Sequence, residues 1–219
     1  MSNKDFLSLL DFSKSELEKI LKFAIKLKKK PVKSLLKAKQ LLMFFEKNST
    51  RTRISFEVGM NQLGGSAVVL QKKETQLGNA SESIADTAKV MSRYGDAIMI
   101  RAYSHDDVKE LAANATIPVI NGLADHNHPC QLMADLQTII ETKGKIDGLK
   151  IVWLGDGNNM CHSWIEAACR FDINLNILVP KKYPPDNDLL EYAIAQGAQI
   201  TIDQDIKKLT KNADVVVTD

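Results

Sequence analysis

A run of hydroxyl and guanidinium side chains, residues 49–53 (Ser-Thr-Arg-Thr-Arg), follows the all-apolar segment 41–45. An apolar run of this length is typical of a strand buried on both faces, and the polar run begins a predicted helix. Backbone N–H groups at a helix start bind anions, and arginine adds a forked donor. Arg101 ends a second apolar run, 97–100, and points a guanidinium at the same sheet edge. The three arginines predict a site for a phosphate-bearing substrate.

A simpler interpretation of the same motif is structural. Ser49 or Thr50 caps the helix, and Arg51 and Arg53 face solvent. The motif alone does not separate the two interpretations, and Arg101 is the residue that favours a phosphate site.

The segment 125–131 (Asp-His-Asn-His-Pro-Cys-Gln) carries a second set of reactive side chains. It invites a metal site, but structural zinc ligands come in pairs and no second pair is present in the sequence. A nucleophilic Cys130 activated by His128 is conceivable, although nothing obvious orients the imidazole. Pro129 is suited to the first position of a helix, so the preferred role of His128 is donation to a carbonyl oxygen beside the helix N-terminus, with Gln131 one turn on.

Gly155-Asp156-Gly157 follows a predicted strand and opens a predicted helix, as a dinucleotide-binding motif does. Met160 stands where that motif has its third glycine, so the paired amides Asn158 and Asn159 indicate a polar grip on a small metabolite instead. Asp219 follows the last predicted strand, where a carboxylate can pair with the ammonium group of an amino acid.

Strands alternate with helices along the whole chain, which predicts an α/β fold of two doubly wound parallel-sheet domains. The domains are expected at 1–143 and 144–219. The predicted strands are 41–45, 67–70, 97–101, 117–120, 150–154, 174–179, 199–202 and 214–218. The predicted helices are 13–30, 51–63, 81–93, 106–114, 129–144, 158–171, 188–197 and 205–212. Ser13 and Glu16 form a capping box for the first helix, and Ser81 or Ser83 caps the third. Residues 67–70 are expected to be buried.

The 219 residues carry 29 Lys and Arg against 27 Asp and Glu, which argues against a dedicated nucleic-acid binder. Lys28–Lys30 is interpreted as a solvated helix end. No apolar run reaches the roughly 20 residues of a membrane-spanning helix, and no secretory signal is recognisable. Cys130, Cys161 and Cys169 are too scattered for a disulfide framework, so a cytoplasmic protein is expected.

Taken together, these motifs resemble the transcarbamoylase family. Residues 44–53 look like its carbamoyl-phosphate signature. Residues 121–125 and 128–131 are similar to the ornithine branch, because the aspartate branch has Thr at the position of Cys130. Residues 155–159 resemble the ornithine-binding segment of that branch. The resemblance implies a carbamoyl-phosphate site built from Ser49, Thr50, Arg51, Thr52, Gln76, Arg101, His128, Pro129, Cys130 and Gln131, with Arg51, Arg101 and His128 catalytic.

The resemblance further implies ornithine contacts at Asn159 and Asp219, and a homotrimer in which Gln76 reaches the site of a neighbouring subunit. The implied reaction joins the carbamoyl group of carbamoyl phosphate to the δ-amine of ornithine, giving citrulline and phosphate, without cofactor or metal. The family continues past this point with a Ser-Met-Gly segment, a His-Cys-Leu-Pro loop and a C-terminal helix, so a truncated second domain is expected. Putrescine or a modified ornithine as acceptor, or an anion-binding module without turnover, are the alternatives.

Overall fold

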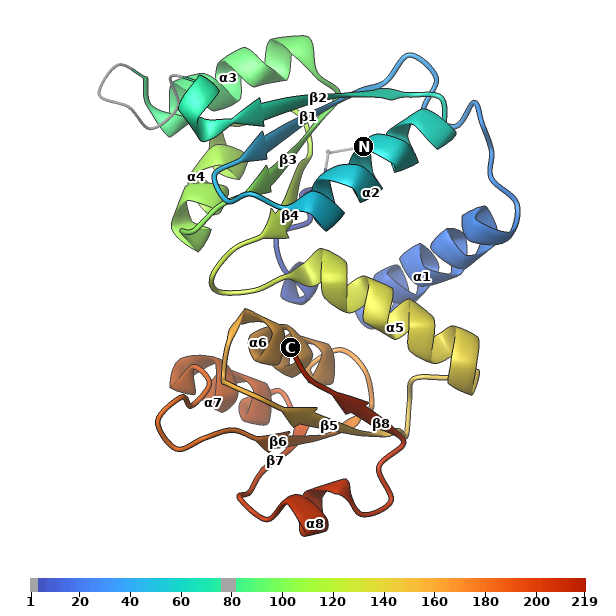
Figure 1. Ribbon diagram of the computed structural model, residues 1–219, viewed down its shortest axis with the longest axis vertical. Coiled ribbons are helices and arrows are strands. Elements are labelled where there is room, and N and C mark those ends of the chain that lie inside the picture. The colour runs from blue at the N-terminus through green and yellow to red at the C-terminus, as the bar shows by residue number, and fades with distance from the viewer. Residues whose placement is uncertain (1–3, 76–81) are drawn as a thin grey trace. The chain divides into compact units, whose positions relative to one another are not determined.

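The first sheet of the computed structural model, which describes residues 4–75 and 82–219, is fully parallel in the order β2-β1-β3-β4. Its strands are β1 (Gln40–Phe45), β2 (Ser66–Gln71), β3 (Ala97–Arg101) and β4 (Val119–Leu123). Helix α2 (Thr50–Gln62) covers one face, and α3 (Ile84–Tyr94) and α4 (His105–Asn114) cover the other (Figure 1). A single turn, η2 (Lys72–Glu74), follows β2.

Side-chain alternation along β1 builds two separate cores. Leu42 and Phe44 belong to a buried cluster with residues of α3 and α4. Leu41, Met43 and Phe45 face the opposite side, where they pack with side chains of α2. Strand β1 is therefore buried on both faces, as its apolar sequence predicts.

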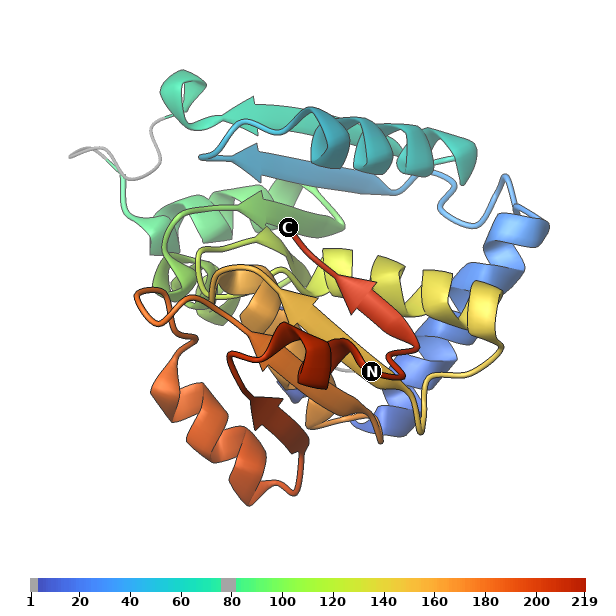
Figure 2. The same cartoon turned by 60° about the horizontal axis from the view of Figure 1, so that its bottom comes forward.

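The second sheet is also parallel, in the order β7-β6-β5-β8. Its strands are β5 (Lys150–Leu154), β6 (Asn174–Leu178), β7 (Gln199–Ile202) and β8 (Val215–Val217). Helices α6 (Asn159–Ala168) and α7 (Asn187–Ala195) lie on one side of this sheet and α8 (Ile206–Thr210) on the other (Figure 1). Figure 2 shows β8 leading to the C-terminus beside β5. Four strands in this order are the first four of a doubly wound fold, so the predicted fold class is confirmed.

The chain divides into two compact units that do not follow the sequence continuously. One unit joins the residues up to Leu7 to Phe23–Asp125, and the other joins Ser8–Lys22 to His126–Asp219. The segment Ser8–Lys22 holds the turn η1 (Leu9–Asp11) and the first part of α1 (Lys14–Lys29). Helix α5 (Pro129–Lys143) also belongs to the second unit. The division of the chain at residues 143 and 144 remains a prediction.

Most predicted elements are present, and two caps are confirmed. The Ser13 N–H donates to the Glu16 carboxylate at 2.8 Å, and the Glu16 N–H donates to the Ser13 hydroxyl at 3.3 Å. Ser83 caps α3 through a bond from the Asp86 N–H. Ser81, the other predicted cap, lies outside the described residues. Among those described residues, no helix is long and apolar enough to cross a membrane.

Three predictions about individual elements are wrong. The strand predicted at 117–120 is Val119–Leu123 instead, because Pro118 has no N–H for the ladder and Phe6 pairs with Ile120. Strand β2 is not buried, since it is the edge of its sheet and Val68 is 38% exposed. Helix α6 ends at Ala168, three residues earlier than predicted.

Candidate active site

The first sheet has its topological switch point between β1 and β3. The chain leaves β1 through α2 to reach β2 on one side, and β3 pairs with β1 on the other. Ligands in open α/β sheets bind outside the carboxyl ends of the strands at such a point. The backbone joins the two ends here, because the Glu46 N–H donates to the Arg101 carbonyl at 2.9 Å. The residues after Phe45 and the side chain of Arg101 therefore occupy the expected binding position.

Arg101 is the central cation of this edge. Arg101 lies two residues after Met99 in β3, so both side chains point to the face of the sheet that α2 covers. One guanidinium N–H donates to the Thr52 hydroxyl at 3.3 Å, while the buried Nε has no hydrogen-bond partner among the described residues. Burial, and then the nearby Arg51, lower the pKa of Arg101. Two cations close enough for the charge of Arg51 to affect the ionisation of Arg101, which has a buried donor not used in the described residues, form a site suited to an anion.

Ser49 has the structural role that the simpler interpretation assigns to it. Its hydroxyl accepts a hydrogen bond from the Thr52 N–H at 3.2 Å and caps α2. Thr50 and Arg51 occupy the first turn and are exposed. The N–H groups of a first turn have no acceptor within their helix, so the cap leaves donors for a bound phosphate. Arg53 does not join them, because its Nε donates to Glu57 at 3.1 Å one turn along the exposed helix surface.

Two residues of this edge were missed by sequence reasoning. Lys47 pairs with Asp125, and its Nζ lies 4.3 Å from the centroid of the Tyr103 ring. Glu46 pairs with Lys72 and accepts a bond from the Tyr103 N–H at 2.8 Å. These contacts tie the ends of β1, β3 and β4 together. Their only sequence signal is the adjacent Glu46-Lys47 before the Ser-Thr-Arg run.

The second sheet has its switch point between β5 and β8, and the predicted ornithine residues lie there. The Asn158 side-chain amide donates to the Asp219 carboxylate at 3.1 Å. The same side chain caps α6 by accepting the N–H groups of Met160 and Cys161. Asn159, the predicted contact, is the first residue of α6. Asn158 belongs to the paired amides predicted to grip a small metabolite, and its place before a helix is that of an N-cap residue.

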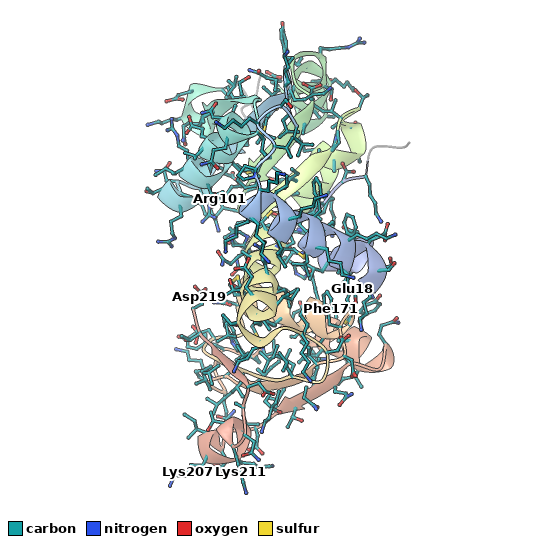
Figure 3. All side chains as sticks on the ribbon, turned by 90° about the vertical axis from the view of Figure 1, so that its right-hand side faces the viewer. Glu18, Arg101, Phe171, Lys207, Lys211 and Asp219 are labelled. Atoms are coloured by element: carbon teal, nitrogen blue, oxygen red, sulfur yellow. The ribbon has the colours of Figure 1, made fainter. Side chains whose placement is uncertain are left out.

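A second carboxylate, Asp135 of α5, stands close to Asp219, which Figure 3 shows beside that helix. Burial raises the pKa of Asp135, an effect that the Gln131 amide opposes and that Asp219 reinforces. Gln131 donates to Asp135 at 2.9 Å. This pair of carboxylates was also missed, and it favours a cationic ligand at the end of β8.

Gly157 shows why the Gly-x-Gly segment is not a dinucleotide motif. A Cβ on Gly157 would lie 2.1 Å from the Pro185 nitrogen and 2.5 Å from the Pro184 carbonyl oxygen. The Gly157 N–H donates to the Tyr183 carbonyl at 2.9 Å. The glycine is therefore needed for contact with the chain itself, and its N–H is not directed at a pyrophosphate.

The segment before α5 bears on two alternatives from the sequence, a nucleophilic cysteine and a metal site. His128 is the N-cap residue of α5, and Pro129 is its buried first residue. Burial raises the pKa of the Cys130 thiol to about 12, which keeps the thiol protonated and argues against a nucleophilic thiolate. Within the described part of the chain, no group of three or more His, Cys, Asp or Glu could hold a metal ion. Gln76 lies outside the described residues.

Comparison with protein-family models identifies both halves of the chain. Residues 4–141 match the carbamoyl-phosphate binding domain of the aspartate/ornithine carbamoyltransferases. Residues 147–219 match the Asp/Orn binding domain of the same family.

Individual relatives agree with these matches. The chain is 49% identical over 227 residues to an ornithine carbamoyltransferase of Anoxybacillus flavithermus, covering 100% of this chain and 72% of the relative. It is 48% identical over 223 residues to an anabolic ornithine carbamoyltransferase of Pseudomonas savastanoi, with the same coverage. The structure of the anabolic ornithine carbamoyltransferase of Campylobacter jejuni superposes with a TM-score of 0.92 at 40% identity, covering 98% of this chain and 73% of the other.

Proposed function

Because the chain belongs to the aspartate/ornithine carbamoyltransferase family, we propose that its two switch points are the two substrate sites of one carbamoyl transfer. The enzyme transfers the carbamoyl group of carbamoyl phosphate to the δ-amine of L-ornithine, giving L-citrulline and phosphate. Carbamoyl phosphate is assigned to the carboxyl ends of β1 and β3, and ornithine to those of β5 and β8. The observation that carries this assignment is the half-buried Arg101, which has a cationic neighbour and a buried donor without a partner in the described part of the chain.

The residue roles follow from the charges that the reaction develops. The ornithine nitrogen attacks the carbonyl carbon, the C–N bond forms, and the bond to the phosphate oxygen breaks. Arg51 and the N-terminus of α2 hold the phosphate. Arg101, Thr52 and His128 donate to the carbonyl oxygen as its negative charge grows. Fixed donors of this kind typically lower the activation barrier by ~3–4 kcal/mol each.

The remaining contacts of the two substrates are assigned in the same way. The list for carbamoyl phosphate is completed by Ser49, Thr50, Gln76, Pro129, Cys130 and Gln131. Asn159 and Asp219 hold ornithine. Asn158, which donates to Asp219, and Asp135, whose pKa the charge of Asp219 helps to raise, join them. The attacking amine must be neutral, although a free amine of this kind has a pKa of about 10.4. Loss of the amine proton is therefore part of the work of this site.

We also propose that the enzyme is a homotrimer. Support comes from apolar side chains on the outer surface of the first unit: Ile54 is 55% exposed and Val58 45% exposed, both on α2. These side chains lie near the edge strand β2, which α2 contacts. A cytoplasmic location is proposed from the cysteines, since all three are free thiols. Light scattering of the wild-type protein and of an Ile54→Lys variant tests the assembly.

An acceptor panel tests the transfer itself. Citrulline or its analogue is measured with the full gene product, carbamoyl phosphate and, in turn, ornithine, putrescine and aspartate. Ornithine is expected to give the highest kcat/KM, and aspartate the lowest, because Asp219 repels a side-chain carboxylate. An Asp219→Asn variant should raise KM for ornithine by at least tenfold while leaving phosphate binding unchanged. Unaltered KM for ornithine in that variant would remove Asp219 from the site.

A further inference from the structure

Helix α6 holds three consecutive residues of the segment before α5, each with a different side chain. The His162 ring Nδ1 lies 2.8 Å from the His126 carbonyl oxygen. The Asn127 amide donates to the Glu166 carboxylate at 2.8 Å, and the His128 N–H donates to the Ser163 hydroxyl at 2.8 Å. We call residues 126–128 the His128 segment.

The ring and hydroxyl contacts have fixed donor and acceptor roles. The Asp186 N–H donates to the His162 Nε2 at 3.0 Å, so Nε2 is an acceptor and Nδ1 carries the hydrogen that bonds His126. The Ser163 hydroxyl donates to the Asn159 carbonyl at 2.7 Å, which directs its lone pairs at His128. Neither side chain can turn without losing a bond.

Glu166 is the carboxylic acid among the three, and it is almost completely buried. It is 1% exposed and Asn127 is fully buried, yet the carboxylate forms no ion pair among the described residues. Its second oxygen accepts the Leu9 N–H at 3.0 Å. The Ser8 hydroxyl also bonds it, and the like charge of the Asp11 carboxylate opposes its ionisation. A buried carboxylate costs several kcal/mol unless hydrogen bonds offset the loss of water, so its retention here calls for a role.

We propose that Glu166 is a positioning residue for carbamoyl transfer, which acts through Asn127 to fix the backbone of the His128 segment. The proposal rests on the role of His128 as donor to the carbonyl oxygen. Such donors act only when held within about 0.5 Å of the productive geometry, and a displacement of about 1 Å costs ~10²-fold in rate. Glu166 and Ser163 supply that restraint from a helix, which is stiffer than the loop that it holds.

A reversed pair of side chains tests the proposal. Above pH 7, where Glu166 is ionised, Asn127→Asp sets two carboxylates against each other and should lower kcat by about 10²-fold, with KM for ornithine changed less than threefold. The Asn127→Asp/Glu166→Gln double variant restores one donor facing one acceptor, and it should recover at least tenfold of the lost kcat. All variants are made in the full gene product, with folding checked by circular dichroism and phosphate binding by calorimetry. The matched control is Asn187→Asp, which disturbs an exposed Asn187–Glu191 bond of 2.7 Å and should leave kcat within twofold.

The outcomes separate this proposal from the proposed function. Equal kcat for His128→Ala and the wild type would refute the role assigned to His128. A large loss in His128→Ala with no recovery in the folded double variant would refute the role of Glu166 alone. If Asn127→Asp does not fold, Asn127→Ala decides: it removes the bond to Glu166 and keeps the bond from the His128 N–H to Ser163. A kcat loss of about tenfold supports the positioning of His128 by α6, and an unchanged kcat overturns it.

Discussion

Replacement of Arg101 by methionine should stabilise the ligand-free protein while abolishing its response to phosphate. The side chain carries a buried Nε with no hydrogen-bond partner among the described residues, and it stands close to Arg51. Arg101→Met keeps an unbranched side chain against α2 and removes both the unsatisfied donor and the like-charge repulsion. A side chain that lowers the stability of the ligand-free protein but binds the ligand illustrates the usual conflict between stability and function.

The size of the effect follows from the contacts. A buried donor without a partner costs about 1–3 kcal/mol, and the substitution removes that cost. Loss of the hydrogen bond to Thr52 destabilises the variant by about 1 kcal/mol. A net gain of about 1 kcal/mol corresponds to a rise in Tm of ~2–4 °C for a chain of this size. Phosphate at 100 times its Kd stabilises the wild type by about 2.7 kcal/mol. In the variant, that stabilisation should fall below about 0.5 kcal/mol at the same phosphate concentration.

The assay is thermal unfolding with and without inorganic phosphate, together with steady-state citrulline formation. The Arg101→Met variant should lose ~10²–10³-fold in kcat, the usual effect of removing one donor to an oxyanion. Arg53→Met is the control, because Arg53 is also cationic and near the start of α2 but pairs with Glu57. It should change Tm by less than about 1 °C, since exposed ion pairs contribute little. A ligand-free Tm that falls in Arg101→Met, with the phosphate response intact, would refute this account of the site.

Four further outcomes are expected. Arg51→Lys should lower kcat by about 10²-fold, because a point charge replaces a planar fork; single-turnover kinetics measures the loss. Cys130→Ser should keep kcat within about threefold, and iodoacetamide should not inactivate the enzyme at pH 7, because burial raises the thiol pKa to about 12. Burial also raises the pKa of Glu166 to about 7 from its ordinary value of 4.5. Between these two pH values the folded state therefore holds a proton on Glu166 that the unfolded state has lost. The free energy of unfolding should fall by at most about 3 kcal/mol as pH rises from 4.5 to 7 and then level off. Urea titrations should show this pH dependence in the wild type and not in Glu166→Gln. Dialysis against a chelator should leave citrulline formation unchanged, and loss of activity together with a stoichiometric metal would contradict this.

The fold was largely predictable because its signals are local. Apolar runs such as 41–45 mark strands of a parallel sheet, and residues such as Ser13, Ser83 and Pro129 mark helix starts. The errors occurred where distant parts of the chain decide the structure. The strand at Val119–Leu123 includes the polar Asn121, whose side chain donates to the Leu7 carbonyl at 3.0 Å. A pairing across 114 positions leaves no trace in a short window of sequence.

The candidate site was predictable only in part, for the same reason. Arg101 and the 49–53 run lie at strand ends, so the topology of the fold brings them to one edge. Counting three arginines left the role of Arg53 open, whereas the helix period places it one turn from Glu57 on the same face of α2. Asp135 and Glu166 could not be recognised from sequence, because a carboxylate on a helix is ordinarily a surface residue. Their significance comes from burial and from partners that only the structure supplies.

The discontinuity of the second unit has a consequence for how the protein is made. Leu9 emerges from the ribosome 157 positions before Glu166, the carboxylate that its N–H satisfies. At a synthesis rate of ~5–20 residues per second, this delay is about 8–30 s, during which the first unit can already fold. The segment Ser8–Lys22 must therefore remain without its packing partners during that interval. It can complete the second unit only after the residues from His126 onward have been synthesised. Deletions or fusions at the N-terminus should therefore slow maturation of the ornithine-binding half, although they lie in the half that is translated first.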